Sequence, residues 1–249
     1  MTLALPGKVH ICPTADELYD AVGRAMMTAA TRAVADNGVF HLALSGGQSP
    51  QPLYVRLMID PIFRDIPWAQ THIWIVDERR VPPDDERSNF RMIRETLADH
   101  VPTRGRQVHR MPVEAEDAAS RYESELRREL APRGRLDFVL LGMGADAHTA
   151  SLFPASHALD ETQRWVVVND GPAVVPPARL TMTYVLLNSS CQIAILVTGP
   201  EKASTIQRVC ERIRESGPNP QELPVTGIRP EGGGLTWFLD DEAAGTGLS

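Results

Sequence analysis

Asp146 and His148 lie two residues apart, directly after the apolar run 137–142. In an α/β sheet the carboxyl end of a strand opens into the crevice where ligands bind, so both side chains are expected to face a substrate. An imidazole titrates near neutrality and can take a proton from a water molecule. A strand-to-helix turn whose histidine only caps or fills space has the same spacing, and for an isolated pair that interpretation is favoured.

A glycine-rich turn after the apolar run 39–44 supplies a second group of candidates: Ser45, Gly46, Gly47, Gln48 and Ser49. Glycines let the backbone approach an anion closely, and free N–H groups at the start of a helix favour a phosphate. We expect Ser49 to cap a helix whose first position is Pro50. A tight turn before a capped helix explains these residues about as well. The turn matches neither the Walker A pattern nor G-x-G-x-x-G, so it does not indicate a nucleotide.

Charged residues directly follow the apolar run HIWIV, which is unusual after a buried strand. Asp77 and Arg79 lie where the crevice is expected. One could orient substrate hydroxyls there, and the other could offset a carboxylate or phosphate charge. Ser88 is expected to cap the next helix, with Asp84 and Asp85 in a solvated turn. Only Asp77 and Arg79 are therefore candidates for a functional site.

Short apolar runs alternate with amphipathic stretches along the chain. Five runs are expected to be buried strands: 39–44, 72–76, 137–142, 165–168 and 193–199. Two stretches show helical spacing of apolar residues, at Ala118, Tyr122, Leu126 and Leu130 and at Ile206, Val209, Cys210 and Ile213. This alternation predicts an α/β protein with a mostly parallel sheet covered by helices. We interpret residues 1–249 as a single domain.

The composition limits the possible classes of function. A chain of 249 residues with 43% hydrophobic and 23% charged residues is typical of a globular protein. Its formal net charge of -7 argues against a nucleic-acid surface. Cys12, Cys191 and Cys210 are too widely spaced to indicate a disulfide framework or a zinc site. We expect a cytoplasmic protein without a membrane span, because neither a leader pattern nor a long apolar run is present.

Five motifs in this order resemble the 6-phosphogluconolactonases of the pentose phosphate pathway: SGGQSP, DERRVPPDDERSN, LGMGADAHTASLFP, ARLTMT and VTGPEKA. The closing LTWFLDDEAA resembles that family's last strand and helix. The resemblance implies a three-layer, Rossmann-like fold of the sugar-phosphate isomerase type, with helices on both faces of the sheet. It also implies hydrolysis of 6-phospho-D-glucono-1,5-lactone to 6-phosphogluconate by a monomer or homodimer. No cofactor and no metal are expected.

The resemblance also implies how the phosphate of the substrate is held. The turn 45–49, Arg179 and Lys202 would bind it together and leave the lactone carbonyl over the strand ends. On position alone, Arg179 and Lys202 would each be interpreted as solvated side chains. Binding of the remote dianion helps to position the reacting carbon.

The same resemblance assigns the reaction to residues that follow the apolar runs 72–76 and 137–142. His148 would be the general base that takes a proton from the attacking water. Asp146 would orient or stabilise that imidazole, or it would contact the substrate separately. Arg79 or nearby backbone N–H groups would stabilise the oxyanion, and Asp77 would contact hydroxyls or water.

One position departs from the family pattern, because Ala147 stands where the family usually has glycine. A positive φ there would strain an alanine and could shift His148. We expect Ala147 to lie in an ordinary helical or β region, since both flanking functional side chains are kept. The remaining histidines are interpreted as structural or solvent-exposed.

Two alternative functions stay open. A glucosamine-6-phosphate deaminase or another sugar-phosphate isomerase would share the fold, but the segment 149–154 has no acidic residue that would supply that chemistry. A non-catalytic sugar-phosphate sensor would keep the pocket, and Ala147 motivates that possibility. Ammonia release and lactone hydrolysis distinguish these functions.

Overall fold

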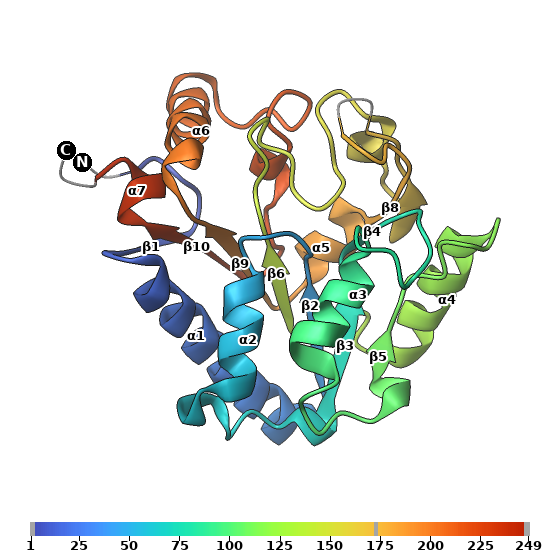
Figure 1. Cartoon of the computed structure of the whole chain (residues 1–249). Coiled ribbons are helices and arrows are strands. Elements are labelled where there is room, and N and C mark those ends of the chain that lie inside the picture. The colour runs from blue at the N-terminus through green and yellow to red at the C-terminus, as the bar shows by residue number, and fades with distance from the viewer. Residues whose placement is uncertain (1–2, 172–173, 247–249) are drawn as a thin grey trace.

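A seven-stranded parallel sheet forms the centre of the protein, with the strand order β1-β10-β9-β6-β2-β3-β5 (Figure 1). The computed structural model describes residues 3–171 and 174–246. The strands of this sheet are β1 Lys8–Cys12, β2 Phe40–Leu44, β3 Thr71–Ile75, β5 Val108–His109, β6 Phe138–Leu141, β9 Gln192–Val197 and β10 Gly234–Asp240. The predicted mostly parallel α/β sheet is confirmed.

A small antiparallel sheet lies beyond the carboxyl end of β3, with the order β4-β8-β7. Its strands are β4 Asp77–Arg79, β7 Val166–Val168 and β8 Arg179–Met182. The run 165–168 thus forms a strand as expected, but outside the parallel sheet. Val76 joins the two sheets, since its N–H donates to Leu44 O at 3.0 Å and its carbonyl accepts from Met182 N at 2.9 Å. β4 therefore has a fixed position over the strand ends.

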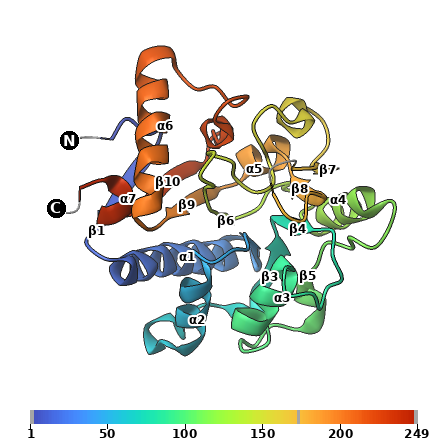
Figure 2. The ribbon, with the colours of Figure 1, turned by 45° about the horizontal axis from the view of Figure 1, so that its top comes forward.

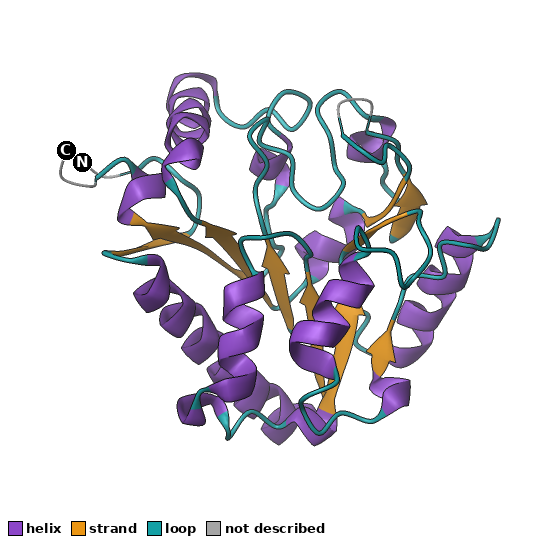
Figure 3. Cartoon of the chain, in the orientation of Figure 1, coloured by secondary structure: helices purple, strands orange, loops and turns teal. Residues whose placement is uncertain are grey.

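Helices pack on both sides of the parallel sheet. Figure 2 shows α1 and α2 on one side and α6 on the other. The helices are α1 Ala15–Asn37, α2 Gln51–Ile59, α3 Asn89–Ile93, α4 Ala118–Glu129, α5 Tyr184–Ser189, α6 Ala203–Ser216 and α7 Asp241–Ala244. A π-helical turn, Arg94–Ala98, continues α3. Figure 3 shows that long loops gather beyond the arrowheads of the strands, which is the side where a ligand site is expected.

Local sequence signals explain where several helices begin and end. Thr14 caps α1 by accepting from Glu17 N at 3.2 Å, and Gly38 ends it with φ 76°. Asp240 caps α7 by accepting from Ala243 N at 2.8 Å. The predicted buried face of α4 is confirmed, with Ala118, Tyr122 and Leu126 all buried. In α6, Ile206 and Val209 are buried, while Cys210 and Ile213 are partly buried.

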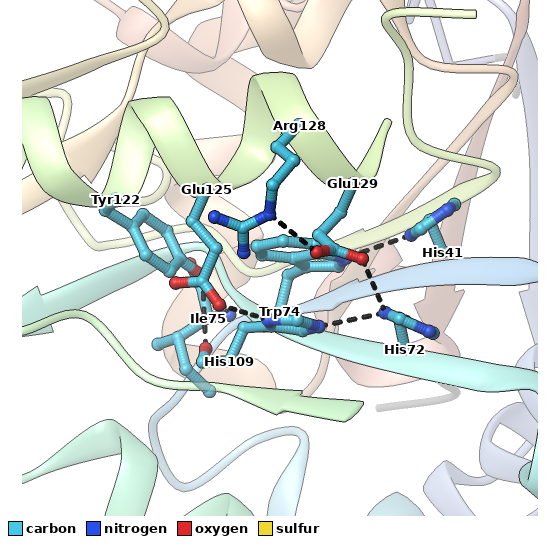
Figure 4. Close-up of polar contacts among 9 residues, drawn as sticks. All are labelled: His41, His72, Trp74, Ile75, His109, Tyr122, Glu125, Arg128 and Glu129. Atoms are coloured by element: carbon cyan, nitrogen blue, oxygen red, sulfur yellow. Dashed lines mark hydrogen bonds and ion pairs between the residues drawn. The ribbon is translucent and has the colours of Figure 1, made fainter. Parts of the chain in front are cut away.

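Three histidines from neighbouring strands form a polar cluster on the face covered by α4 (Figure 4). His72 Nδ1 lies 2.9 Å from His109 Nε2, and His109 Nδ1 lies 2.7 Å from Glu125 Oε1. The Trp74 ring stacks on His109 with a centroid distance of 3.7 Å, and its Nε1 donates to His41 Nδ1 at 3.2 Å. These contacts tie β2, β3, β5 and α4 together, so the interpretation of these histidines as structural agrees with the fold.

Candidate active site

The loops that follow β2, β3 and β6 enclose a cavity of about 190 Å³ at the carboxyl end of the sheet. Its walls contain candidate residues from three of the sequence motifs, in one place. The lining residues are 45–50, Asp77, Arg79, Asn89, 142–144 and 148–150. The glycine-rich turn and His148 therefore lie at the same end of the sheet.

The glycine-rich turn offers backbone donors to this cavity. Within the described part of the chain, the N–H groups of residues 46–49 donate to no protein acceptor. They lie just before α2, where the helix dipole adds to their attraction for an anion. The carbonyl of Ser45 accepts from Tyr54 Oη at 2.6 Å, which fixes the start of the turn. The arrangement is suited to hold a phosphate group.

The two glycines of the turn are required for different reasons. Gly47 has φ 100°, a conformation that strains any residue with a Cβ. Gly46 has no positive φ, but a Cβ there would lie 1.9 Å from Asn89 Oδ1. Gly47 is needed for the backbone conformation, and Gly46 is needed for the close packing against Asn89.

The prediction that Ser49 caps a helix starting at Pro50 is wrong. α2 begins at Gln51, and Pro50 itself takes the capping position without a side-chain hydrogen bond. Pro50 still accepts from Tyr54 N at 3.1 Å through its carbonyl, so its fixed φ serves the turn that precedes the helix. Ser49 consequently stays available in the cavity wall.

Asp77 and Arg79 project from β4 into the cavity wall. The Asp77 carboxylate is buried and accepts from Ser151 Oγ at 2.6 Å through Oδ2. Arg79 is half-buried, and its Nη1 donates to Arg87 O at 2.5 Å. Asp77 is thus held in place by a residue 74 positions later in the chain, a contact that no local sequence pattern predicts.

Glu78, which lies between Asp77 and Arg79, has a structural role that the sequence analysis did not predict. The residue is 2% exposed, and its carboxylate accepts from the backbone N–H groups of Arg79, Asn89 and Phe90 at 2.7 to 2.8 Å. Ser88 Oγ also donates to it, at 3.0 Å. Burial raises the pKa of Glu78, and these hydrogen bonds act against that rise. Glu78 therefore joins β4 to the start of α3.

Ser88 caps α3 as expected, because its Oγ accepts from Arg91 N at 3.1 Å. Asp85 lies in the preceding turn and forms an ion pair with Arg87 at 2.7 Å. These residues fix the loop that carries Asp77 and Arg79 without lining the cavity themselves.

His148 and Asp146 form a hydrogen-bonded pair. The distance from His148 Nδ1 to Asp146 Oδ1 is 2.5 Å, and the same oxygen accepts from His148 N at 3.1 Å. Burial alone would raise the pKa of Asp146, but the hydrogen bond and charge of His148 lower it overall. A Cβ at Gly144 would lie 2.2 Å from the His148 ring, so glycine is needed beside the pair. His148 lines the cavity, and Asp146 does not.

The expectation that Ala147 lies in an ordinary backbone region is wrong, because its φ is 64°. This left-handed residue lies between the hydrogen-bonded side chains of Asp146 and His148. The backbone is fixed on both sides, since Ala147 N donates to Gly144 O at 3.0 Å and its carbonyl accepts from Val225 N at 2.9 Å. Ala147 is fully buried.

Arg179 and Lys202 do not line the cavity in this structure. Arg179 is buried on β8 opposite Arg79, and its guanidinium donates to the carbonyl of Pro176. Burial and then the charge of Arg79 lower the pKa of Arg179. Lys202 precedes α6, whose Thr205 donates to Ala145 O at 2.9 Å. Both cations are thus near the loops of the site but outside its wall.

Three polar residues at the site were missed by sequence reasoning. Asn89 and Thr149 line the cavity, and Ser151 holds Asp77. Thr149 Oγ1 donates to Gly142 O at 2.8 Å and closes the loop after β6. Each lies within a recognised motif, yet only the contacts between distant loops show its role.

Among residues 3–171 and 174–246, no group of three or more histidine, cysteine, aspartate or glutamate side chains is placed to hold a metal ion. In the same part of the chain, no helix is both long and apolar enough to cross a membrane.

Residues 13–237 match the family of glucosamine-6-phosphate isomerases and 6-phosphogluconolactonases, and the chain belongs to this family. A probable chloroplastic 6-phosphogluconolactonase of Oryza sativa subsp. indica is 37% identical over 224 residues, which cover 85% of this chain and 67% of the rice protein. The crystal structure of the Thermotoga maritima 6-phosphogluconolactonase has a TM-score of 0.79 at 27% identity and covers 94% of this chain and 99% of that one. The resemblance seen in the motifs is confirmed at the level of the family.

The rabbit GDH/6PGL endoplasmic bifunctional protein is 38% identical over 236 residues. The match covers 92% of this chain but only 29% of the rabbit protein, so this chain corresponds to less than a third of that relative. A monomeric glucosamine-6-phosphate deaminase shares the fold with a TM-score of 0.77 at 22% identity, covering 96% of this chain and all of that one.

Proposed function

We propose that this chain hydrolyses 6-phospho-D-glucono-1,5-lactone to 6-phosphogluconate in the oxidative pentose phosphate pathway. The observation that carries the proposal is one cavity whose wall contains both His148 and the N–H groups of residues 46–49, which are free within the described part of the chain. Such a cavity can bind the phosphate of a phosphorylated sugar with these N–H groups and present the ester of the sugar to a water molecule activated by His148. The 6-phosphogluconolactonases among its relatives support this choice of substrate.

His148 acts as the general base in this proposal. When its Nδ1–H donates to Asp146, 2.5 Å away, the neutral imidazole has Nε2 as its acceptor. Nε2 takes a proton from water, whose oxygen attacks C1 of the lactone. The tetrahedral intermediate then collapses, the bond from C1 to the ring oxygen breaks, and that oxygen receives the proton from His148.

Charge on the substrate is compensated by groups at both ends of the cavity. Residues 45–49 bind the phosphate, and Arg79 stabilises the oxyanion that develops at C1. Asp77, fixed by Ser151, accepts from a sugar hydroxyl or orients the water. Arg179 and Lys202, which lie outside the wall, add to the positive field that attracts the dianion.

Replacement of His148 by alanine tests the proposed base. We expect kcat to fall by about 10² to 10⁴, which is the usual contribution of a general base. The affinity for 6-phosphogluconate, measured by calorimetry, should change little because the phosphate turn is intact. Lactone hydrolysis must be followed above the uncatalysed rate. Unchanged turnover in His148→Ala would remove the base from the mechanism.

The shared fold of the monomeric deaminase makes ammonia release from glucosamine 6-phosphate the second activity to measure. Within 149–154, the chain TASLFP has no carboxylate, so we expect no release above background. Product binding without faster lactone hydrolysis would instead identify a sensor.

We also propose that the protein acts in the cytoplasm as a monomer or homodimer. Its three cysteines, Cys12, Cys191 and Cys210, are unpaired, as is usual in a reducing compartment. Light scattering on the eluting peak of a sizing column determines the oligomeric state, and fractionation of the source cells determines the compartment.

A further inference from the structure

Asn89 joins two parts of the cavity wall that lie far apart in the sequence. Asn89 is 2% exposed, and its Nδ2 donates to Asp77 O at 2.6 Å and lies 3.5 Å from Asp77 Oδ1. Its backbone N–H is fixed by Glu78 Oε1 at 2.7 Å. The amide group is therefore held rigidly against β4.

The other end of the amide faces the glycine-rich turn. A Cβ built on Gly46 would lie 1.9 Å from Asn89 Oδ1 and 2.1 Å from its Cγ. In glycine a hydrogen takes that direction, so a Cα–H of Gly46 points at Oδ1, the geometry of a weak C–H···O contact. Asn89 thereby occupies the space between the phosphate turn and the carboxylate of Asp77.

No conventional donor reaches Asn89 Oδ1 among the described residues. An unpaired buried amide oxygen is unfavourable, and an apolar side chain of similar shape would avoid that cost. Ser45 Oγ, in the same wall, is also buried and unpaired. The Asn89 amide is thus paired with β4 through Nδ2 and keeps an unpaired oxygen in the cavity wall, next to the glycine-rich turn.

We propose that Asn89 is a positioning residue that sets the Asp77 carboxylate relative to the phosphate turn. The inference rests on the proposed lactonase function for its kinetic consequences. Asn89 acts through its two neighbours: Nδ2 directs Asp77 toward the sugar, and Oδ1 supports Gly46 and the N–H groups that follow it. A shift of either neighbour moves the reacting carbon relative to His148, and small shifts of this kind change rates strongly.

Asn89→Asp is the sharpest test because it keeps the shape of the side chain and replaces the Nδ2 donor with a carboxyl oxygen. At pH 8 the introduced carboxylate lies beside Asp77 and Glu78, so kcat/KM is expected to fall at least about ten-fold. When the introduced carboxyl is protonated near pH 5 it can again donate to Asp77 O. The ratio of variant to wild-type kcat/KM should then recover by about three-fold or more. A ratio within about two-fold of one at pH 8, or one that does not change with pH, would overturn the inference.

A double-mutant cycle separates positioning from a general loss of structure. If Asn89 acts through Asp77, then Asp77→Asn combined with Asn89→Asp should lose much less activity than the product of the single losses. Asn188 supplies the matched control: its Nδ2 donates to Gly227 O at 2.9 Å and its Oδ1 accepts from Arg229 N at 2.7 Å, away from the cavity. Asn188→Asp should lower the melting temperature without a pH-dependent change in the kcat/KM ratio. Fully multiplicative losses at Asp77 and Asn89 would contradict the proposal.

Titration with inorganic phosphate tests the second neighbour without any lactonase activity. Loss of the contact to Gly46 in Asn89→Ala should weaken phosphate binding by about three- to ten-fold, because the turn loses its support. Asn188→Ala should leave the phosphate affinity unchanged. If wild type does not hydrolyse the lactone, the proposed function fails, and phosphate affinity still decides the role of Asn89. Equal phosphate affinity in wild type and Asn89→Ala would overturn it.

Discussion

At the scale of single residues, Ala147 shows how close the proposed catalytic loop is to a conformational limit. A left-handed alanine costs about 1–2 kcal/mol relative to glycine, and φ is 64° here. The residue is also fully buried, so its methyl group contributes about 0.8 kcal/mol through burial. Alanine further reduces the entropy of the unfolded chain, by about 0.4–1 kcal/mol. The opposing effects are similar in size, which explains how alanine is accommodated.

Two substitutions at Ala147 test this balance. Ala147→Gly should leave the free energy of unfolding within about 1 kcal/mol of wild type, with lactone hydrolysis retained. Ala147→Val should destabilise by about 2 kcal/mol or more, because a β-branched residue is strongly disfavoured at positive φ. It should also lower kcat by moving His148. Denaturant unfolding and initial rates are the measurements, and a fully active, stable Ala147→Val would contradict the conformation described.

The residue types of the site could be predicted from the sequence, but their spatial partners could not. Asp77, Arg79 and His148 follow apolar strands, and the topology of a parallel sheet brings such positions together. Ser151 and Asn89 lie within the quoted motifs, but their roles arise from contacts between loops, which the motifs do not show. The positive φ of Ala147 could not be predicted, because the backbone hydrogen bonds that hold this residue, to Gly144 and Val225, are known only from the fold.

At the scale of secondary structure, the histidine cluster between β2, β3, β5 and α4 makes the sheet sensitive to acid. Burial, followed by repulsion from His72, Arg133 and His109, lowers the pKa of His41 to about 3. The pKa of His72 is lowered as well, by burial and then by His109, while Glu129 opposes the change. Both histidines are therefore more easily protonated in the unfolded chain.

The sign of the pH dependence follows from this difference. An unfolded histidine titrates near pH 6.5, so below that pH the unfolded chain binds protons that the folded cluster does not. The contribution of the neutral His41 and His72 to the free energy of unfolding is complete above about pH 6.5. It declines as the pH falls toward the pKa values of these histidines in the folded protein. His41 alone can lower the free energy of unfolding by up to about 1.4 kcal/mol for each pH unit in this range.

His41→Gln is expected to flatten the pH dependence of the unfolding free energy between pH 6 and pH 4. Glutamine can still accept from Trp74 Nε1, so the cluster keeps that hydrogen bond. His10→Gln, at an exposed position on β1, is the control and should leave the slope unchanged. If the unfolding free energies of wild type and His41→Gln change equally with pH, His41 is not the source of the acid sensitivity.

The elements themselves were largely predictable where periodicity was strong. The spacing in α4 identified its buried face, and the apolar runs located β2, β3, β6 and β9. The run at β7 lies in the antiparallel sheet instead, because a three-residue apolar strand contains no signal for the direction of its partner. α2 begins at Gln51 and not at the predicted Pro50, because Pro50 belongs to the turn that carries the N–H groups of residues 46–49.

At the scale of the whole molecule, one hydrophobic cluster extends from β1 to β5 and includes both faces of the parallel sheet. Trp74 on β3 and Trp237 on β10 are fully buried in different parts of it. We propose that residues 1–249 fold as one domain. Tryptophan fluorescence and far-UV circular dichroism should then report the same thermal transition. Two separated transitions would show independent domains.

The unpaired N–H groups before α2 belong to the main chain, so most amino-acid replacements around them cannot delete them. The proposed phosphate-binding element therefore depends less on side-chain identity than the other residues of the cavity wall do. If these N–H groups hold the phosphate as proposed, the scaffold can change its chemistry at the sugar while that interaction is kept. Lactone opening and amine release on one architecture are a natural outcome of that division of labour.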